Sequence, residues 1–290
     1  MASMRDIKRR KGSIQSTQQI TKAMKLVSTV KLQRAKQNAE KSGTYFRYMY
    51  DTVNSILKRT KNLNHKYLKS GETGKKAVIV ITSNRGLAGG YNSNVIKLIT
   101  RGELANEDLA IYAIGKKGKE ALQRKYEVKA DYSDVIEEPA YADAMVISKE
   151  ILEAFANGEI SEIYLAYTAF KNTVVHIPTL LKLLPVEIKE ETQVDAEGED
   201  AAESKVPMNF EPEDEEALNL LIPKYITSLI YGGMVEAVAS ENGARMQAMD
   251  SATSNAEEMI DNLTLLYNRA RQGSITQELT EIIAGANAIS

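Results

Sequence analysis

The chain has 290 residues, with 37 lysine and arginine residues against 39 aspartate and glutamate residues, for a formal net charge of -2 and no cysteine. The lack of cysteine excludes disulfide bonds and thiolate metal sites and favours an intracellular setting. No apolar run approaches the ~20 residues of a membrane-spanning helix, and the charged start lacks the apolar core of a signal peptide, so we expect a soluble protein.

Charge is distributed unevenly along the chain. Residues 1–69 hold 17 basic and three acidic residues, whereas the rest of the chain holds 20 basic and 36 acidic residues. Thirteen of the acids lie between Glu187 and Glu216, a stretch whose composition is typical of a solvated loop. The basic N-terminal segment indicates an acidic partner, attracted over long range in a way that salt weakens.

A first long helix is predicted from about Ser3 to about Asn62, because the segment has no proline and is rich in good helix formers. From Leu32 onward, apolar or small residues recur at alternating steps of three and four, which is the heptad pattern of a helix that faces a partner helix. The positions are Leu32, Ala35, Ala39, Ser42, Phe46, Met49, Val53, Ile56, Thr60 and Leu63.

The period changes after the glycines at 71 and 74, and strand-like runs begin to alternate with short helical segments. This order is typical of a parallel sheet with helical crossovers, so we expect a Rossmann-like α/β domain at residues 71–210. The predicted strands are Lys76–Thr82, Leu109–Ile114, Glu162–Thr168 and Val174–Ile177, and the predicted helices are Asn92–Thr100, Lys116–Lys125 and Ala140–Ala156.

The helical period returns at about Glu213 and lasts to about Ala284, with an expected kink or a separate short helix at Pro223. A second heptad seam runs through Met249, Ala252, Ala256, Met259, Leu263, Leu266, Ala270 and Gly273. The fold class is therefore α/β with long helices, in which an N-terminal helix (1–70) and a C-terminal helix (211–290) pair as an antiparallel coiled coil around the inserted domain.

The last residues of the chain, 275–290, are apolar around most of the helix circumference, with only Glu278 and Glu281 charged. A helix that is apolar on every side must be buried. A pair of helices cannot enclose this segment, so we expect it to lie inside another protein.

The sequence offers no catalytic constellation. The glycine-rich segment Ser83–Asn92 lies between a strand and a helix, where α/β proteins bind phosphate, but its glycines fit neither dinucleotide-binding nor phosphate-loop spacing. A tight turn is favoured, and a nucleotide-binding α/β protein remains an alternative. His65 and His176 have no metal-site spacing, so we expect neither metal nor cofactor. The third hypothesis is a coiled-coil protein that binds nucleic acid. It is disfavoured because no aromatic residue lies among the lysine and arginine residues before Tyr45.

Three segments resemble the gamma subunit of F-type ATP synthases. They are Ile14–Ser28 (IQSTQQITKAMKLVS), Arg85–Asn92 (RGLAGGYN), and the C-terminal pair Ala244–Met249 and Tyr267–Ala286, the last of which carries the specific motif ITQELTEIIAGA. The resemblance therefore covers both ends and the centre of the chain. It departs from the family pattern at Ala88, where other members often carry different residues.

The resemblance implies a non-catalytic central shaft, present in one copy, that couples ion flow through a membrane c-ring to ATP synthesis or hydrolysis on a hexamer of alpha and beta subunits. It also implies an epsilon subunit beside the α/β domain, no nucleic acid partner, and a peripheral position on the cytoplasmic face of the cell membrane. The residues that it assigns to hexamer contact are Met24, Lys25, Arg245, Arg271, Gln272, Thr276 and Glu278. It leaves the coupling ion, proton or sodium, undetermined.

Overall fold

The computed structural model describes residues 3–59, 67–68, 74–186 and 214–289. Two helices dominate it: α1 (Met4–Arg59) with 56 residues and α5 (Asp214–Ile289) with 76 residues. Contacts divide the chain into two compact units, one of Met1–Val30 with Arg245–Ser290 and one of Lys31–Ala244. The sequence-based domain boundaries at 70 and 210 stay a prediction about how the chain is organised.

The unit of residues 31–244 contains a five-stranded sheet in the order β3-β2-β1-β4-β5. The strands β1 (Lys75–Ile81), β2 (Leu109–Ile114), β3 (Glu127–Asp131) and β4 (Ile160–Phe170) are parallel. Their order 3-2-1-4 is that of the doubly wound Rossmann arrangement, so the expected fold class is confirmed. The fifth strand, β5 (His176–Leu184), pairs with β4 in the antiparallel direction.

The central strand β1 is buried on both faces, which explains its nearly continuous apolar sequence. Ile79 and Ile81 point to one hydrophobic cluster, and the alternate residues Val78 and Val80 belong to the other. The second cluster is closed by α2 (Tyr91–Arg101) and α3 (Lys116–Leu122), through the buried side chains Val95, Ile99 and Leu122.

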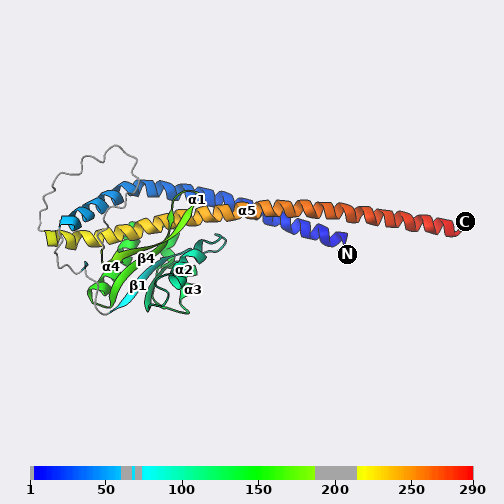
Figure 1. Cartoon of the computed structure of the whole chain (residues 1–290). Coiled ribbons are helices and arrows are strands. Elements are labelled where there is room, and N and C mark those ends of the chain that lie inside the picture. The colour runs from blue at the N-terminus through cyan, green and yellow to red at the C-terminus, as the bar shows by residue number, and fades with distance from the viewer. Residues whose placement is uncertain (1–2, 60–66, 69–73, 187–213, 290) are drawn as a thin grey trace. The chain divides into compact units, whose positions relative to one another are not determined.

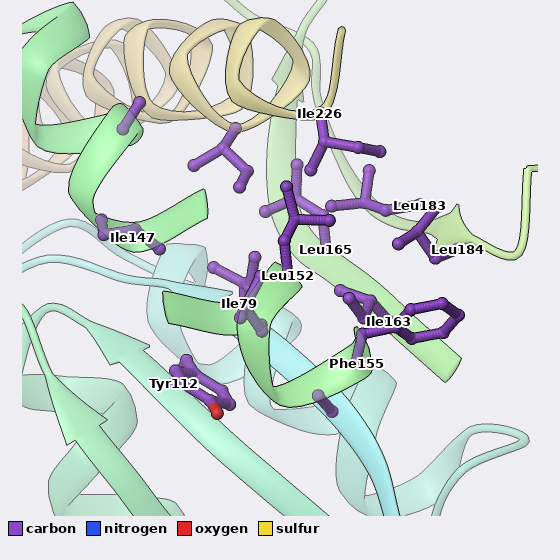
Figure 2. Close-up of a cluster of buried hydrophobic side chains, with 14 of the residues drawn as sticks. Ile79, Tyr112, Ile147, Leu152, Phe155, Ile163, Leu165, Leu183, Leu184 and Ile226 are labelled. Carbon is purple, nitrogen blue, oxygen red and sulfur yellow. The ribbon is translucent and has the colours of Figure 1, made fainter. Parts of the chain in front are cut away.

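The first cluster is closed by α4 (Tyr141–Ala156) and by the first part of α5, which cover the same face of the sheet (Figure 1). Ile226 of α5 meets Leu165 and Leu183 of the sheet and Leu152 of α4 in this cluster (Figure 2). The buried residues of α5 recur at helical spacing, at Leu218, Ile222, Ile226, Ile230, Met234 and Ala237. One face of α5 is thus part of the core of the α/β unit.

Two glycines and a proline in α5 do not interrupt it. The helix runs through Pro223 as one element, so the expectation of a separate short helix there is wrong. A Cβ on Gly233 would lie 2.9 Å from Cδ2 of Leu165, so a side chain here would displace the end of Leu165, because α5 approaches β4 closely.

Two strands differ from the sequence-based prediction. β3 was not predicted, because its sequence EVKAD alternates between exposed and half-buried positions at the edge of the sheet and carries no apolar run. The last strand begins at His176 rather than Val174, and it is antiparallel rather than parallel. Only residues 171–175 separate it from β4, and a parallel strand needs a crossover of about a dozen residues or more.

We predict that Ile226→Ala lowers the free energy of unfolding by about 2–5 kcal/mol, because it leaves a cavity between α5 and the sheet. Ile226 is 0% exposed. The matched control is Leu220→Ala on the same helix, where the side chain is 59% exposed and the change should stay within about 0.5 kcal/mol. Urea unfolding followed by circular dichroism measures both, and equal effects would contradict the placement of α5 in the core.

Candidate functional sites

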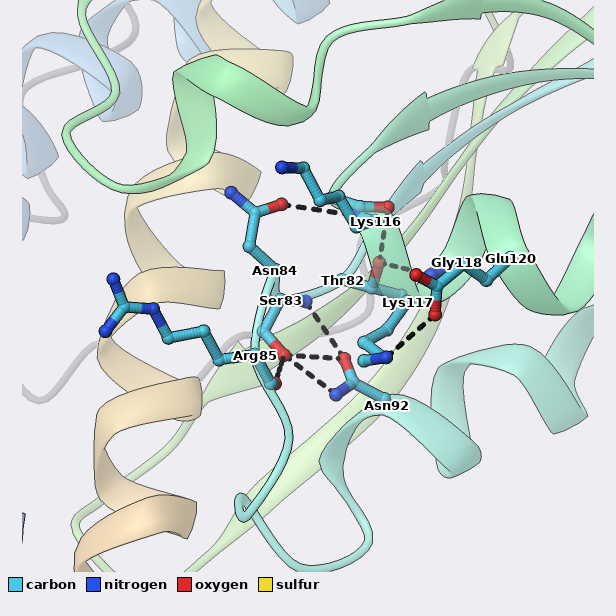
Figure 3. Close-up of polar contacts among 10 residues, drawn as sticks. Thr82, Ser83, Asn84, Arg85, Asn92, Lys116, Lys117, Gly118 and Glu120 are labelled. Carbon is cyan, nitrogen blue, oxygen red and sulfur yellow. Dashed lines mark hydrogen bonds and ion pairs between the residues drawn. The ribbon is translucent and has the colours of Figure 1, made fainter.

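The glycine-rich segment that follows β1 is held by its own side chains (Figure 3). Asn92, in the first turn of α2, accepts a hydrogen bond at Oδ1 from the backbone N–H of Ser83, at 2.9 Å, and its Nδ2 donates to Ser83 Oγ at 2.7 Å. Leu87 adopts a left-handed φ of 63° within the turn. The segment is a tight turn, as the favoured reading of the sequence expected.

The start of α3, beside this turn, offers no open phosphate cradle. The three backbone N–H groups that point out of the helix start are already bonded to the end of β1 and the turn after it. Lys116 N donates to Asn84 Oδ1 (3.0 Å), Lys117 N to Ser83 O (3.1 Å) and Gly118 N to Thr82 Oγ1 (2.8 Å). These three backbone donors are therefore used within the protein, at the start of α3.

Gly115 and Gly118, at the start of α3, lie in close contact with Thr82, the residue that follows β1. Gly115 has a φ of 110°, and a Cβ on it would lie 2.0 Å from Thr82 O, so no other residue fits. A Cβ on Gly118 would lie 2.8 Å from Thr82 Oγ1. These glycines therefore serve packing rather than the binding of a ligand.

The described residues contain no group of three or more His, Asp or Glu side chains that could hold a metal ion. Among those same residues, none of the helices is long and apolar enough to cross a membrane.

In the other unit, residues 4–30 of α1 pair with residues from 245 onward of α5. The hydroxyls of Thr21 and Thr253 lie 2.7 Å apart in the buried seam, and Lys25 Nζ lies 2.5 Å from Asp250 Oδ1. From the first contact to the second, the residue number rises on α1 and falls on α5, so the two helices are antiparallel. The other buried positions of the seam are Ile7 and Ser28 on α1 and Met249 and Ala256 on α5.

The seam on α5 follows a slightly different track from the one predicted. Met259 and Leu266 are exposed, whereas Ile260, Leu263 and Tyr267 are half-buried. The buried seam position after Met249 is Thr253, four residues on, and not Ala252, three residues on as predicted. The prediction chose Ala252 because Thr253 is polar. The seam on α1 also begins far earlier than Leu32. The apolar pattern missed its first members because they are polar or isolated.

The C-terminal part of α5 has no partner helix among the described residues. The register set by Thr21 and Thr253 brings the start of α1 to about residue 270 of α5, and the end of α5 extends past the start of α1 (Figure 1). Four large apolar side chains stand exposed beyond that point: Ile275 at 48%, Leu279 at 55%, Ile282 at 68% and Ile283 at 59%. We call these four residues the apolar tip.

The residues predicted to contact other subunits fall into two groups on this helical pair. Met24 and Arg245 are half-buried, and Lys25 is engaged with Asp250 of the opposite helix. Arg271, Gln272, Thr276 and Glu278 are exposed close to the apolar tip, and the Thr276 hydroxyl donates to the backbone oxygen of Gln272 at 2.9 Å. At 1.5 Å per residue, the two groups on α5 lie about 40 Å apart along the helix.

A surface that sequence reasoning did not assign lies on α1. Ile20, Leu26, Val27 and Val30 are all more than half exposed and share one side of the helix, away from the buried seam. Their spacing is helical, and this spacing was the available signal. The sequence analysis did not recognise this spacing, because basic residues dominate the composition of the segment.

The fold and surfaces define a class of protein: two long helices together with an α/β domain, with apolar side chains exposed on both helices. The family model described as ATP synthase matches residues 3–289. The ATP synthase gamma chain of Lachnoclostridium phytofermentans is 64% identical over 291 residues, covering all of both chains. The sodium ion specific ATP synthase gamma chain of Acetobacterium woodii is 40% identical, with 99% of each chain covered.

Solved structures agree in fold. A chain from the Tetrahymena thermophila mitochondrial ATP synthase, in a structure of the central stalk and c-ring, has a TM-score of 0.59 and 25% identity over 80% of this chain and 99% of its own. A chain from the Euglena gracilis mitochondrial ATP synthase has a TM-score of 0.67 at 17% identity, over 99% and 94%. The chain belongs to the family of ATP synthase gamma chains. It is a central-stalk subunit of the rotary machine and not the catalytic one.

We predict that Thr21→Val and Thr253→Val each lower the free energy of unfolding by about 1 kcal/mol, because each leaves the other hydroxyl without its partner across the seam. The double variant should cost less than the sum of the two, since both polar groups are then removed together. Thr17→Val is the control, because the exposed hydroxyl of Thr17 bonds only to its own helix at Ser13 O. Thermal unfolding measures all four proteins, and strict additivity would contradict a direct Thr21–Thr253 contact.

Proposed function

We propose that the paired helices enter a hexamer of alpha and beta subunits, and that they couple the passage of ions through a membrane c-ring to ATP synthesis and hydrolysis at the hexamer. An epsilon subunit accompanies the α/β domain, one copy of the chain serves each complex, and the complex lies on the cytoplasmic face of the cell membrane. The observation that carries this proposal is the apolar tip, four exposed apolar side chains at the end of a helix, which no other helix covers in the described part of the chain.

The tip supports insertion into a protein sleeve through the energetics of apolar surface. Leaving Ile275, Leu279, Ile282 and Ile283 in water forgoes about 25 cal/mol for each Å² of apolar area that a sleeve would cover. A contiguous apolar surface on an otherwise charged helix is the feature by which protein interfaces are recognised. The predicted contacts Arg271, Gln272, Thr276 and Glu278 belong to the same stretch of α5 and supply polar specificity around it.

The basic face of α1 supports contact with acidic segments of the beta subunits. Lys22 is exposed, and the stripe of Ile20, Leu26, Val27 and Val30 beside it supplies apolar area. A partner surface that combines carboxylates with apolar side chains complements both features. Met24 lies next to this stripe, one helical turn after Ile20, and Lys25 lies at the seam beside Asp250 of α5. We retain both, with Arg245, as proposed contacts.

Coupling follows from asymmetry. A single pair of helices cannot present the same surface to three beta subunits at once, so each subunit meets a different part of it. When the contact with the helices favours one conformation of a beta subunit over another, it changes the populations of these conformations. The nucleotide affinity of that subunit changes with them. Turning the helices then changes the three affinities in sequence, while hydrolysis turns the helices in the opposite sense.

The assignment of chemistry to the partners is tested by reconstitution. We expect the purified chain to hydrolyse no ATP, and a mixture with alpha and beta subunits to form a complex with strong ATPase activity. The matched control omits only this chain from the mixture. Hydrolysis by the isolated chain, or equal activity with and without it, would show that it does not act as the coupling subunit.

The proposed contact at the end of α5 is tested by Arg271→Ala combined with Gln272→Ala. Both side chains are exposed, so the chain should fold normally, whereas loss of a charged contact at an interface typically costs 2 kcal/mol or more, about 30-fold in affinity. We expect weaker assembly or less ATP-driven ion pumping per ATP hydrolysed in reconstituted vesicles. Lys97→Ala on α2, also exposed, is the control. Unchanged pumping by the double variant would count against the contact.

A further inference from the structure

The hairpin between β4 and β5 contacts both long helices within the unit of residues 31–244. Its contacts come from one residue of α1 and from two turns of α5, and they join backbone, ring and side-chain groups. Lys36 Nζ lies 5.3 Å from the centre of the Phe170 ring and 3.4 Å from Thr173 Oγ1, Glu236 Oε2 accepts the Phe170 N–H at 3.3 Å, and Ser240 Oγ donates to Thr168 O at 3.0 Å.

His176, the first residue of β5, completes this set of contacts against α5. A Cβ on Gly243 would lie 2.5 Å from His176 Nε2. The ring therefore packs directly on the backbone of α5 at Gly243, which has no side chain. The other side of the ring faces Phe170, with the two ring centres 5.9 Å apart. The contact leaves no space between the ring and α5.

The Nε2 atom of His176 is buried and has no hydrogen-bond partner among the described residues. Burial lowers the pKa of His176 below its ordinary value, which keeps the ring neutral at neutral pH. Protonated His176 carries an N–H on both ring nitrogens, so a buried, charged N–H would stand at Nε2 with helix backbone in front of it and no acceptor among the described residues.

The charged groups around the ring do not offset such a charge. Lys36, from α1, is itself positive and stands over the Phe170 ring, and Lys171 in the hairpin is exposed. Glu236, from α5, directs its carboxylate to the Phe170 N–H, and burial raises its pKa. Glu241 also lies on α5, two residues before Gly243, and is half-buried. Burial alone accounts for the lowered pKa of His176, with no charge partner contributing to it.

We propose that the β4–β5 hairpin is a latch that holds α1 and α5 against the α/β domain while His176 is neutral, and that uptake of a proton by His176 opens it. In the open form the ring turns to water and the contacts at Lys36, Glu236 and Ser240 are released with it. If the function proposed above holds, an open latch loosens the contact of the α/β domain with α1 and with residues 236–243 of α5, while the buried face of α5 stays in the core. The latch itself does not depend on that function.

The direction of the pH effect follows from the two states. The closed form has the lowered pKa and the open form the ordinary value near 6.5, so the open form binds the proton more readily. The closed form is fully favoured above about pH 6.5 and loses its advantage as pH falls from there to the lowered pKa. Within that window, opening becomes up to about tenfold more frequent for each pH unit.

Amide hydrogen exchange of the full-length chain at pH 7.5 and pH 5.5 tests the latch. Comparing each variant with the wild type at the same pH cancels the intrinsic pH dependence of exchange. We expect residues 168–177 and 238–244 to open up to about tenfold more often at pH 5.5 in the wild type, and no such increase in His176→Phe. His65→Gln, which removes the only other histidine, should respond as the wild type does.

Two further variants make the result specific. Glu236→Gln keeps an acceptor for the Phe170 N–H but removes the carboxyl group, so its pH response should persist if His176 is the sensor. Gly243→Ala should open the hairpin already at pH 7.5, because its methyl group takes the place of the ring, whereas Gly273→Ala on the same helix meets nothing within 4 Å and should not. A pH response that survives in His176→Phe, or that disappears in Glu236→Gln, overturns the proposal.

Discussion

The burial of one face of α5 against the sheet is the constraint on which the rest of the structure depends. Ile222, Ile226, Ile230 and Met234 are fully buried in the same cluster as the central strand β1. The helix that supplies the C-terminal part of the coiled coil is therefore anchored in the core of the α/β unit. Removing it would expose the part of this sheet face that α4 does not cover, so the α/β unit is incomplete without this helix.

The coiled-coil seam serves register more than stability. Its buried positions include Thr21, Ser28 and Thr253, which bury little apolar area, and at about 25 cal/mol per Å² such layers contribute less than leucine layers do. The Thr21–Thr253 contact and the Lys25–Asp250 pair act differently, because each forms in only one alignment of the two helices. The ion pair is partly exposed, so its own contribution is about 0–1 kcal/mol. Each threonine hydroxyl also bonds to a carbonyl of its own helix, so these polar contacts favour one alignment by the bond that they add across the seam.

Sequence reasoning succeeded where burial on both sides produced an uninterrupted apolar run, as in β1 and β2, and where helix length exceeded the needs of a globular domain. It failed where side-chain pattern carried no burial signal. β3 is an edge strand of charged residues, and β5 was misplaced because Asn172, whose Oδ1 accepts from the N–H groups of Val174 and Val175, forms the turn there. The apolar tip was predicted from composition alone, whereas the pairing of Lys25 with Asp250 requires a register between residues 225 positions apart. No local pattern contains that information.

The α/β domain has the architecture of dinucleotide-binding domains. The strand order, the glycine-rich turn after β1 and the helix that follows it all stand where dinucleotide-binding proteins place theirs. At a different helix, α3, the acceptors for the first backbone donors come from Thr82, Ser83 and Asn84, so those donors are satisfied internally. Fold alone does not specify activity. In this chain these polar groups join the segment that follows β1 to the start of α3, and this contact is part of how the sheet and its covering helix pack.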